Sequence, residues 1–143
     1  MKSYKILGDV AIADVAFEAT GDNLNEVFEA CADASFDVMV DVNTVKDKEV
    51  KEVSLVSDNV EDLLFEFLEE IILIKDRDYF IFNCCEVVIN EEKDKVGLNA
   101  KFFGEAINTE KQDLKVDIKA VTLHMFSLKK KPQGYVATVV LDI

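Results

Sequence analysis

The spacing of apolar residues along the chain predicts two helices. From about residue 22 to 40, apolar side chains recur every three or four positions, which places them on one side of a helix. The preceding TGDN, residues 20–23, contains residue types that cap helix N-termini. A second such segment runs from about residue 58 to 75, and its Asp58 and Glu61 stand at the spacing of a capping box. Its apolar stripe is the wider of the two, so this helix is expected to be central.

Alternating or short apolar runs predict strands in the rest of the chain. The predicted strands cover about residues 4–7, 13–19, 51–57, 79–90, 95–103, 116–128 and 134–141. Four of them follow the second helix in succession and are joined by short turns such as NEEKD and KKPQG, which favours antiparallel pairing. The sequence therefore predicts an α+β fold with two helices packed on one face of a mostly antiparallel β-sheet.

The pattern changes within the sixth predicted strand. Over residues 114–120, apolar residues at even positions alternate with charged residues at odd positions, as in a strand with one solvent-exposed face. Beyond Lys119, odd positions are apolar as well, so this part is expected to be covered on both sides. His124, the single histidine of the chain, lies there in line with Ala120 and Phe126. It is interpreted as a core histidine in a supporting role.

Length and composition favour one domain over residues 1–143. Half of the 143 residues are apolar, which is enough for one hydrophobic core, and no repeat or linker composition marks a boundary. No apolar run is long enough for a membrane span, and the start MKSYKILGD lacks the apolar block of a signal peptide. Three cysteines without a framework spacing suggest reduced thiols rather than disulfides or zinc ligands. The expected location is the cytoplasm.

The charge balance bears on possible partners. The chain has 16 Lys and Arg against 29 Asp and Glu, a formal net charge of −13, which repels phosphate backbones. Direct nucleic-acid binding is therefore not expected. Such a protein can still act on RNA indirectly, by docking on a basic enzyme that holds the RNA. The simpler interpretation is that the acidity keeps a small protein soluble.

Carboxylates are the main candidates for chemistry. The sequence contains no P-loop, no GxGxxG and no Ser-His-Asp arrangement. Asp14 lies in the apolar stretch IADVAF, and Asp142 lies in the terminal VVLDI beside the free carboxylate of Ile143. Such carboxylates are costly unless they are paired or bind metal, and three oxygen ligands suit Ca²⁺ or Mg²⁺ if the first and last strands pair. The alternatives are a strand-edge charge at Asp14 and a frayed tail at Asp142.

The chain resembles the archease family over nearly its whole length. The resemblance rests on five stretches: IADVAF, DNLNEVFEACADASFDVMVD, EDLLFEFLEEIILI, LKVDIKAVTLH and the terminal VVLDI. It implies a small α+β protein cofactor of the tRNA-splicing RNA ligase, which joins 2′,3′-cyclic-phosphate and 5′-hydroxyl ends through a GMP-linked histidine. The implied role is to promote guanylylation of the ligase and its multiple turnover, without catalysis by the cofactor itself.

The resemblance also implies a metal site. Asp14, Asp142 and Ile143 match the positions that hold a divalent cation, usually assigned as Ca²⁺, with Mg²⁺ as the alternative. The sequence departs from the family at the His-Thr-Ala-Asp motif, where Ala11 and Ile12 replace the usual histidine and threonine. If the usual histidine helps to bind the metal or to position a partner, its replacement by Ala11 would weaken or alter that function.

Two further residues match the family's KAVT.H segment and are candidates for a partner surface. Lys119 occupies the last charged position of its strand face, at the rim of a covered surface, and its alternative role is that of a solvated strand lysine. His124 is assigned a supporting role at the same surface. No direct contact with nucleic acid or membrane is expected.

Three functions remain open from the sequence. The first is an RNA-ligase activator that acts by protein contact and a bound cation. The second is a metal-dependent hydrolase that uses Asp14 and Asp142, although carboxylates are the only visible general bases. The third is a general chaperone or interaction module, which the acidity permits without specifying.

Overall fold

The computed structural model describes the backbone of residues 1–11 and 13–143, and the side chains of these residues except 9–11. The elements follow in the order β1 (Ser3–Ala11), β2 (Asp14–Gly21), α1 (Leu24–Met39), a 3-10 helix (Val42–Thr44), β3 (Glu49–Ser57), α2 (Val60–Asp78), β4 (Phe80–Glu91), β5 (Val96–Ala106), β6 (Ala120–Lys131) and β7 (Gly134–Asp142). Within these residues, no helix combines the length and apolar composition needed to cross a lipid bilayer.

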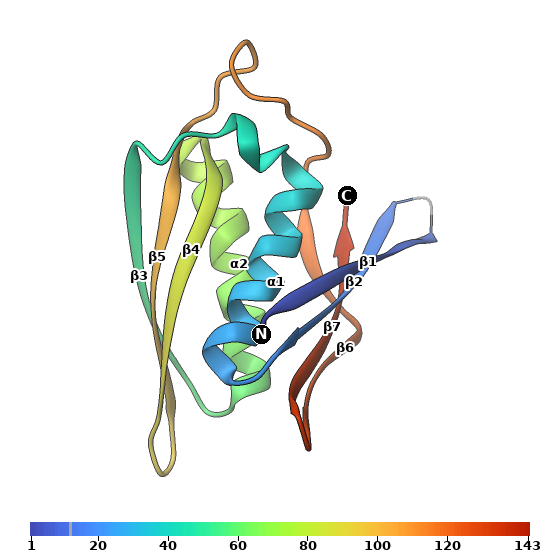
Figure 1. Ribbon diagram of the computed structural model, residues 1–143, viewed down its shortest axis with the longest axis vertical. Helices are drawn as coiled ribbons and strands as arrows, with labels where there is room; N and C mark the ends of the chain where they lie inside the picture. The colour runs from blue at the N-terminus through green and yellow to red at the C-terminus, as the bar shows by residue number, and fades with distance from the viewer. Residues whose placement is uncertain (12) are drawn as a thin grey trace.

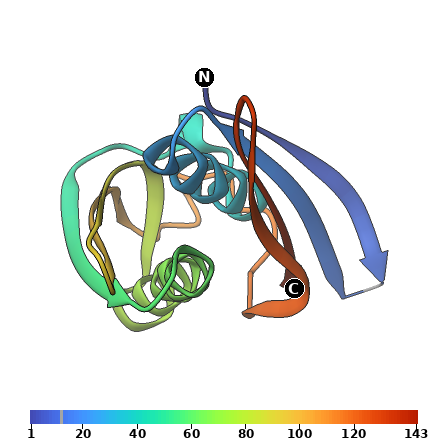
Figure 2. The ribbon, with the colours of Figure 1, turned by 90° about the horizontal axis from the view of Figure 1, so that it is seen from below.

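The strands form two antiparallel sheets with both helices between them. One sheet has four strands in the order β1-β2-β7-β6, and the other has three in the order β3-β5-β4. Figures 1 and 2 show α1 and α2 in the space that separates the sheets. The predicted α+β class, the two helices and the antiparallel pairing are confirmed. The arrangement differs from the prediction in one respect. The strands belong to two sheets rather than one, so the helices are covered from two sides.

The composition of α1 explains this difference. Phe28 points to one side of the helix, and Ala30 and Ala34 lie on the opposite side, yet all three are fully buried. Small side chains let a second sheet approach the helix closely, and α1 contacts both β4 and β2. The apolar periodicity identified one buried side of this helix, and the alanines form the other.

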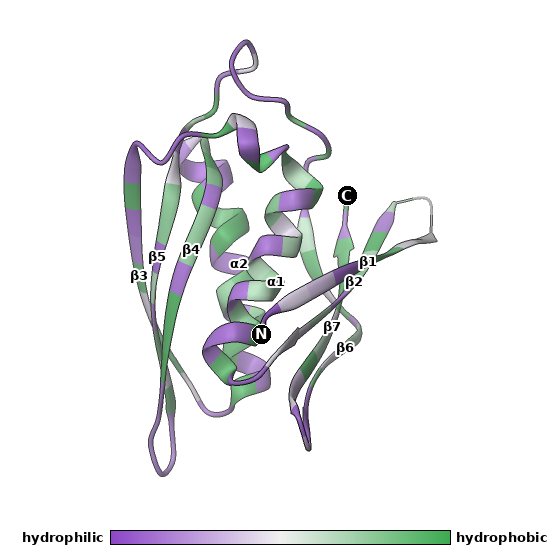
Figure 3. Ribbon diagram, viewed as in Figure 1, coloured by the Kyte–Doolittle hydropathy of each residue, from purple (hydrophilic) through white to green (hydrophobic). Residues whose placement is uncertain are grey.

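The centre of the fold is a cluster of phenylalanine rings. Phe36 stacks on Phe82 with ring centroids 4.8 Å apart, and Phe67 stacks on Phe102 at 5.6 Å. These rings join both helices to the three-stranded sheet, and each contributes about 2–3 kcal/mol through burial. Phe17 adds the four-stranded sheet to the same core. Figure 3 shows the corresponding alternation of hydrophobic and hydrophilic residues along helices and strands.

Both helices begin at an asparagine cap. Asn23 accepts a hydrogen bond from the backbone N–H of Glu26 at 2.9 Å, within the predicted TGDN cap. For α2 the predicted capping box at Asp58 is displaced by one residue, because Asn59 is the cap and accepts from the N–H of Asp62 at 2.8 Å. Asp58 instead pairs with a lysine of the β4–β5 turn. The helix consequently begins at Val60.

The sixth predicted strand begins later than expected. Residues 115–119 belong to no strand, and β6 starts at Ala120. The segment crosses from one sheet to the other over the C-terminal ends of the helices (Figure 1), where the N–H of Lys115 donates to the carbonyl of Met39 at 2.8 Å. Ile118 is buried in the core. The alternation of residues 114–120 therefore does not mark a strand with one exposed face. Leu114 and Val116 are exposed, and Ile118 is the one fully buried apolar residue of the segment.

A bulge of three extra residues interrupts β6. Because of this bulge, the prediction for His124 is wrong. Thr122 pairs with Val140 and Ser127 with Thr138, so five steps along β6 match two along β7 and three residues are extra. The bulge turns through a left-handed residue, Met125, with φ of 54°. His124 is exposed rather than buried in the core, and the prediction that this stretch is covered on both sides is wrong. Alternation cannot reveal a bulge, since the pairing with β7 creates it.

Candidate functional site

The pairing of β2 with β7 brings the two candidate aspartates together. These strands run in an unbroken antiparallel register in which Asp14 lies directly opposite Asp142. The N–H of Ile143 donates to the carbonyl of Ala13 at 2.8 Å, which holds the C-terminal residue next to the pair. The expected pairing of the N-terminal strand that carries Asp14 with the C-terminal strand is therefore present, and the strand that carries Asp14 is β2. The carboxylates of Asp14, Asp142 and Ile143 therefore belong to neighbouring residues at one end of this sheet, where β7 reaches the C-terminus in Figure 1.

The arrangement concentrates negative charge. Side chains directly opposite in an antiparallel pair lie on the same face with Cβ atoms roughly 5 Å apart, and like charges there are destabilising. Asp14, Asp142 and Ile143 are each half-buried. Among the described residues, no salt bridge involves any of the three. A cation bound between them would remove this repulsion.

The donor set decides which cation fits. Two aspartates and the C-terminal carboxylate offer oxygen ligands alone, the set that hard cations such as Ca²⁺ and Mg²⁺ prefer. The described residues contain no group of three or more His, Cys, Asp and Glu side chains placed to hold a metal, so Asp14 and Asp142 would need a further ligand, for which the sequence predicts the carboxylate of Ile143. Of the motif positions replaced in this sequence, Ile12 lies outside the described residues, as does the side chain of Ala11. The cation site of Asp14, Asp142 and Ile143 remains a prediction.

Lys119 adjoins this cluster through the backbone. Its N–H donates to the carbonyl of Asp142 at 2.8 Å, and the next residue, Ala120, pairs with Asp142 across β6 and β7. The Lys119 side chain is exposed. The cationic side chain of Lys119 thus lies at the end of the crossing segment, immediately before β6, the strand that flanks the carboxylates.

A buried lysine that the sequence analysis missed anchors the crossing segment. Lys75, at the C-terminal end of α2, is 5% exposed, and its Nζ lies 2.5 Å from Asp117 and 2.6 Å from Asp76. Burial by itself lowers the pKa of Lys75, but the two carboxylates outweigh this effect and the pKa is raised. Because Asp117 lies two residues before Lys119, the ion pair helps to position Lys119. The one sequence feature that marks Lys75 is its position at the end of the apolar run ILIK.

His124 lies on the same strand as this cluster but farther along it. Two paired residues of β6, Val121 and Thr122, separate Ala120 from the bulge that carries His124. The structure therefore brings Lys119, Asp14, Asp142 and Ile143 together, and it places His124 on an exposed projection beyond them.

The cysteines offer no activated nucleophile. All three are free thiols, and burial raises the pKa of Cys31 and Cys85 well above the usual range. Cys84 is more exposed, and partial burial also raises its pKa. The thiols are therefore protonated at neutral pH.

Fold and site together define a class: a small α+β protein in which two antiparallel sheets enclose two helices and carboxylates gather at the chain end. The chain belongs to the archease family, since the model described as "Archease protein family (MTH1598/TM1083)" matches residues 4–143. The protein archease of Pyrococcus abyssi is 42% identical over 132 residues, which cover 92% of this chain and 93% of that protein. The protein archease of Methanothermobacter thermautotrophicus is 35% identical over 143 residues, 100% of each chain.

Solved structures agree with the architecture. The solution structure of Methanobacterium thermoautotrophicum protein 1598 matches with a TM-score of 0.84 and 34% identity, covering 99% of this chain and 98% of that one. The crystal structure of an archease from Thermotoga maritima, described as a "possible chaperone", matches with a TM-score of 0.63 and 20% identity over 93% of each chain. The second likeness supports the fold alone. The resemblance identified from the sequence is confirmed.

Proposed function

We propose that this protein activates an RNA ligase of the tRNA-splicing type, promoting guanylylation of the ligase and its multiple turnover. The observation that carries the proposal is the register that sets Asp14 opposite Asp142 beside the C-terminal carboxylate. Membership of the archease family supports it, and so does the net charge of −13, which favours a basic protein partner over bare RNA. The partner is a protein, and the protein itself performs no chemical step.

The residues have separate roles in this proposal. Asp14, Asp142 and the carboxylate of Ile143 hold a divalent cation, Ca²⁺ or Mg²⁺. The bound cation supplies positive charge that balances the three carboxylates and stabilises the paired ends of β2 and β7. Lys119 projects from the edge of this cluster and contacts the ligase or a phosphate group held by it. His124, exposed on the bulge, provides a supporting contact.

Neither alternative function gains support from the site. A hydrolase needs a general base next to the metal, but the register partners of the two aspartates on their outer sides are alanines, Ala11 and Ala120. A general chaperone would act on unrelated clients as well as on the ligase. Chaperone activity is distinguished from specific activation of the ligase by testing whether this protein also prevents the aggregation of an unrelated protein.

The test is ligation by the RNA ligase of the same organism under multiple-turnover conditions, with and without this protein. We expect turnover and guanylylation to increase with the wild-type protein. Lys119→Ala should reduce activation without removing the metal, whereas Lys130→Ala, at an exposed position of β6, should leave activation unchanged. Turnover that does not improve with the wild-type protein would remove the proposal.

A further inference from the structure

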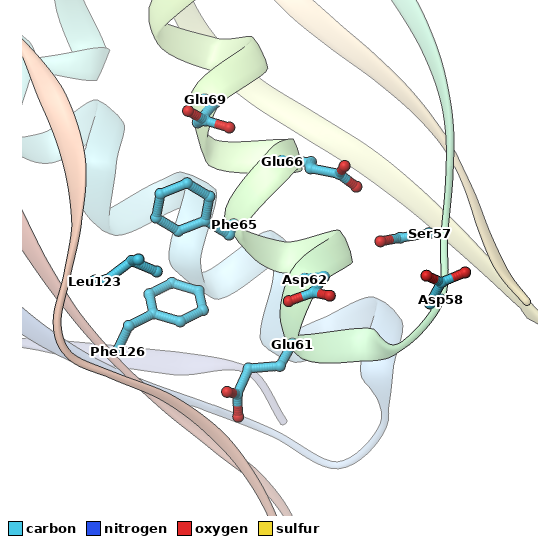
Figure 4. Close-up of a pocket in the computed structure, with 9 residues that line it drawn as sticks. All are labelled: Ser57, Asp58, Glu61, Asp62, Phe65, Glu66, Glu69, Leu123 and Phe126. Carbon is cyan, nitrogen blue, oxygen red and sulfur yellow. The ribbon is translucent and has the colours of Figure 1, made fainter.

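A groove runs between α2 and β6, away from the carboxylate cluster. Its volume is about 620 Å³, and it is open to solvent. Figure 4 shows carboxylates distributed along α2 and three apolar side chains, Phe65, Leu123 and Phe126, gathered beside β6. The groove thus combines an acidic side and an apolar side.

The apolar side exposes more hydrophobic surface than the fold requires. Phe65 and Phe126 meet edge to face with ring centroids 5.4 Å apart, and both stay half-buried. Leu123 is 76% exposed and Met125 is 53% exposed, both on the bulge with the left-handed residue. This bulge adopts an unfavourable backbone conformation and exposes apolar side chains, so it does not stabilise the core. A binding partner that buries these side chains would account for it.

Of the five carboxylates that line the groove, Asp58 is paired with Lys95, and the other four lack a cationic partner in the part of the chain that the structure describes. Among the described residues, no salt bridge involves Glu61, Asp62, Glu66 or Glu69, although all four line the groove. Like charges at spacings of three and four residues destabilise a helix, and Glu66 and Glu69 lie beyond the first turn, where the helix dipole favours acidic residues. These two glutamates also border a second hollow beside Leu73, itself 48% exposed. The fold does not neutralise this charge, whereas a basic partner would.

We infer that this groove docks a segment of the partner protein that carries Lys or Arg residues around one large apolar side chain. The apolar residue packs on Phe65, Phe126 and Leu123, and the basic residues face the carboxylates of α2. The identity of the partner as the RNA ligase rests on the proposed function. β6 connects the two surfaces, because Leu123 at the groove lies three steps along the strand, about 10 Å, from Ala120 at the carboxylate cluster.

The first experiment measures binding to the immobilised ligase across a range of salt concentrations. We expect Glu66→Lys with Glu69→Lys to weaken binding about tenfold or more at low salt and to flatten its salt dependence. The matched control, Glu91→Lys with Glu92→Lys, makes the same charge change at the exposed end of β4 and the start of the β4–β5 turn, and it should stay within about twofold of wild type. Leu123→Ser should weaken binding several-fold with the salt dependence unchanged, whereas Val88→Ser, 52% exposed on the other sheet, should not.

A second arm separates this inference from the proposed function. If the wild-type protein neither binds nor activates the ligase, the proposed function fails, and a fluorescent peptide of lysine and leucine then tests the groove alone. Its affinity should fall for the groove variants but not for their controls, and a peptide with serine in place of leucine should bind more weakly. Equal losses in groove and control variants, with ligase or with peptide, would overturn the inference.

The main competing occupant is a second copy of this chain. The C-terminal end of β6 carries Lys129, Lys130 and Lys131 and is a basic segment that an acidic groove would attract. Sedimentation of the wild-type protein tests this occupant directly. A wild-type dimer that Glu66→Lys with Glu69→Lys dissociates would assign the groove to self-association and overturn docking of the partner protein.

Discussion

The two sheets differ in the regularity of their pairing. In the three-stranded sheet, β3 and β5 stay in register from Glu49 to Ser57, and β4 and β5 shift once. In the four-stranded sheet, β1 and β2 shift twice, and β6 bulges by three residues against β7. Its regular pair is β2 with β7, and that pair ends at Asp14 and Asp142. The candidate site thus lies on an ordered pair of strands flanked by irregular ones.

The difference follows from what each sheet packs against. The three-stranded sheet supplies Phe82 and Phe102 to the aromatic cluster, and β5, which carries Phe102, stays in regular register with β3. The one register shift of this sheet lies in β4, directly after Phe82. Its edge strand β4 is also closed by α1, because Glu29 and Asn25 accept hydrogen bonds from the N–H groups of Val87 and Ile89. The four-stranded sheet tolerates bulges and can present side chains to a partner. One sheet therefore mainly builds the core, and the other carries the candidate site.

The largest expected effect tests this division directly. Phe102→Ala removes a fully buried ring that contacts three other phenylalanines, and it should lower the free energy of unfolding by about 3–5 kcal/mol. Leu123→Ala on the exposed bulge should change it by no more than about 0.5 kcal/mol. Urea unfolding of both variants provides the measurement. Comparable losses would show that the bulge is part of the core after all.

The next effect concerns the segment that joins the two sheets. Lys75→Met removes the ion pairs with Asp76 and Asp117 and should lower the free energy of unfolding by about 1–2 kcal/mol, since both carboxylates are largely solvated. Hydrogen exchange at the N–H groups of Lys115 and Lys119 should become faster. Arg77→Met, on an exposed arginine of the same helix, is the control. Unchanged exchange at Lys119 would remove the positioning role of Lys75.

A third experiment tests the role of the two aspartates at the end of the regular β2–β7 pair. Without divalent cations, Asp142→Asn should raise the free energy of unfolding by about 0.2–1 kcal/mol, because it relieves repulsion with Asp14. With calcium present the same variant should be the less stable one, and calorimetry should show at least about a tenfold loss of calcium affinity, or about 1.4 kcal/mol. Asp94→Asn in the exposed β4–β5 turn is the control. Wild-type calcium affinity in both Asp142→Asn and Asp14→Asn would show that these residues do not form the site.

The smallest effect is a pH dependence at the three-stranded sheet. Glu105 accepts a hydrogen bond from the N–H of Lys46 at 2.9 Å, and this bond, with help from Gln112, holds the pKa of Glu105 below its usual value. A lowered pKa in the folded state stabilises the protein above the unfolded pKa of about 4.5, and the stabilisation is lost as pH falls through the folded value. Glu105→Gln should therefore be less stable than wild type at neutral pH.

The stability gap between Glu105→Gln and wild type should narrow in acid. Thermal unfolding between neutral and acidic pH measures it, with Glu110→Gln as an exposed control. A gap that stays constant with pH would mean that ionisation of Glu105 does not contribute.

Local patterns predicted the elements but not all their partners. The two helices were predictable because their apolar residues repeat at helical spacing and asparagine caps precede them. The segment 116–119 was predicted as strand because it alternates, yet its backbone bonds to α1 and β7 in a crossing connection. Alternation in the sequence therefore did not identify a strand here, and it did not predict burial either, since Val116 is exposed and Ile118 is buried.

The candidate site shows the same limit. Asp14 and Asp142 were noticeable because carboxylates interrupt apolar strands, and their pairing could be expected from the two chain ends. The ion pair of Lys75 with Asp117 joins residues 42 positions apart and left no recognisable pattern. The exposure of His124 depends on a bulge that exists because β6 pairs with β7 on both sides of it.

The sequence by itself determined the α+β class, the two helices, the archease resemblance and the carboxylates at both ends of the chain, because each depends on residues that are near in sequence or on their chemical type. Tertiary structure decided the division into two sheets, the position of the bulge, the anchoring of Lys119 and the groove beside α2. Those features arise from contacts between distant segments, whose register and packing are chosen by the free energy of the whole fold.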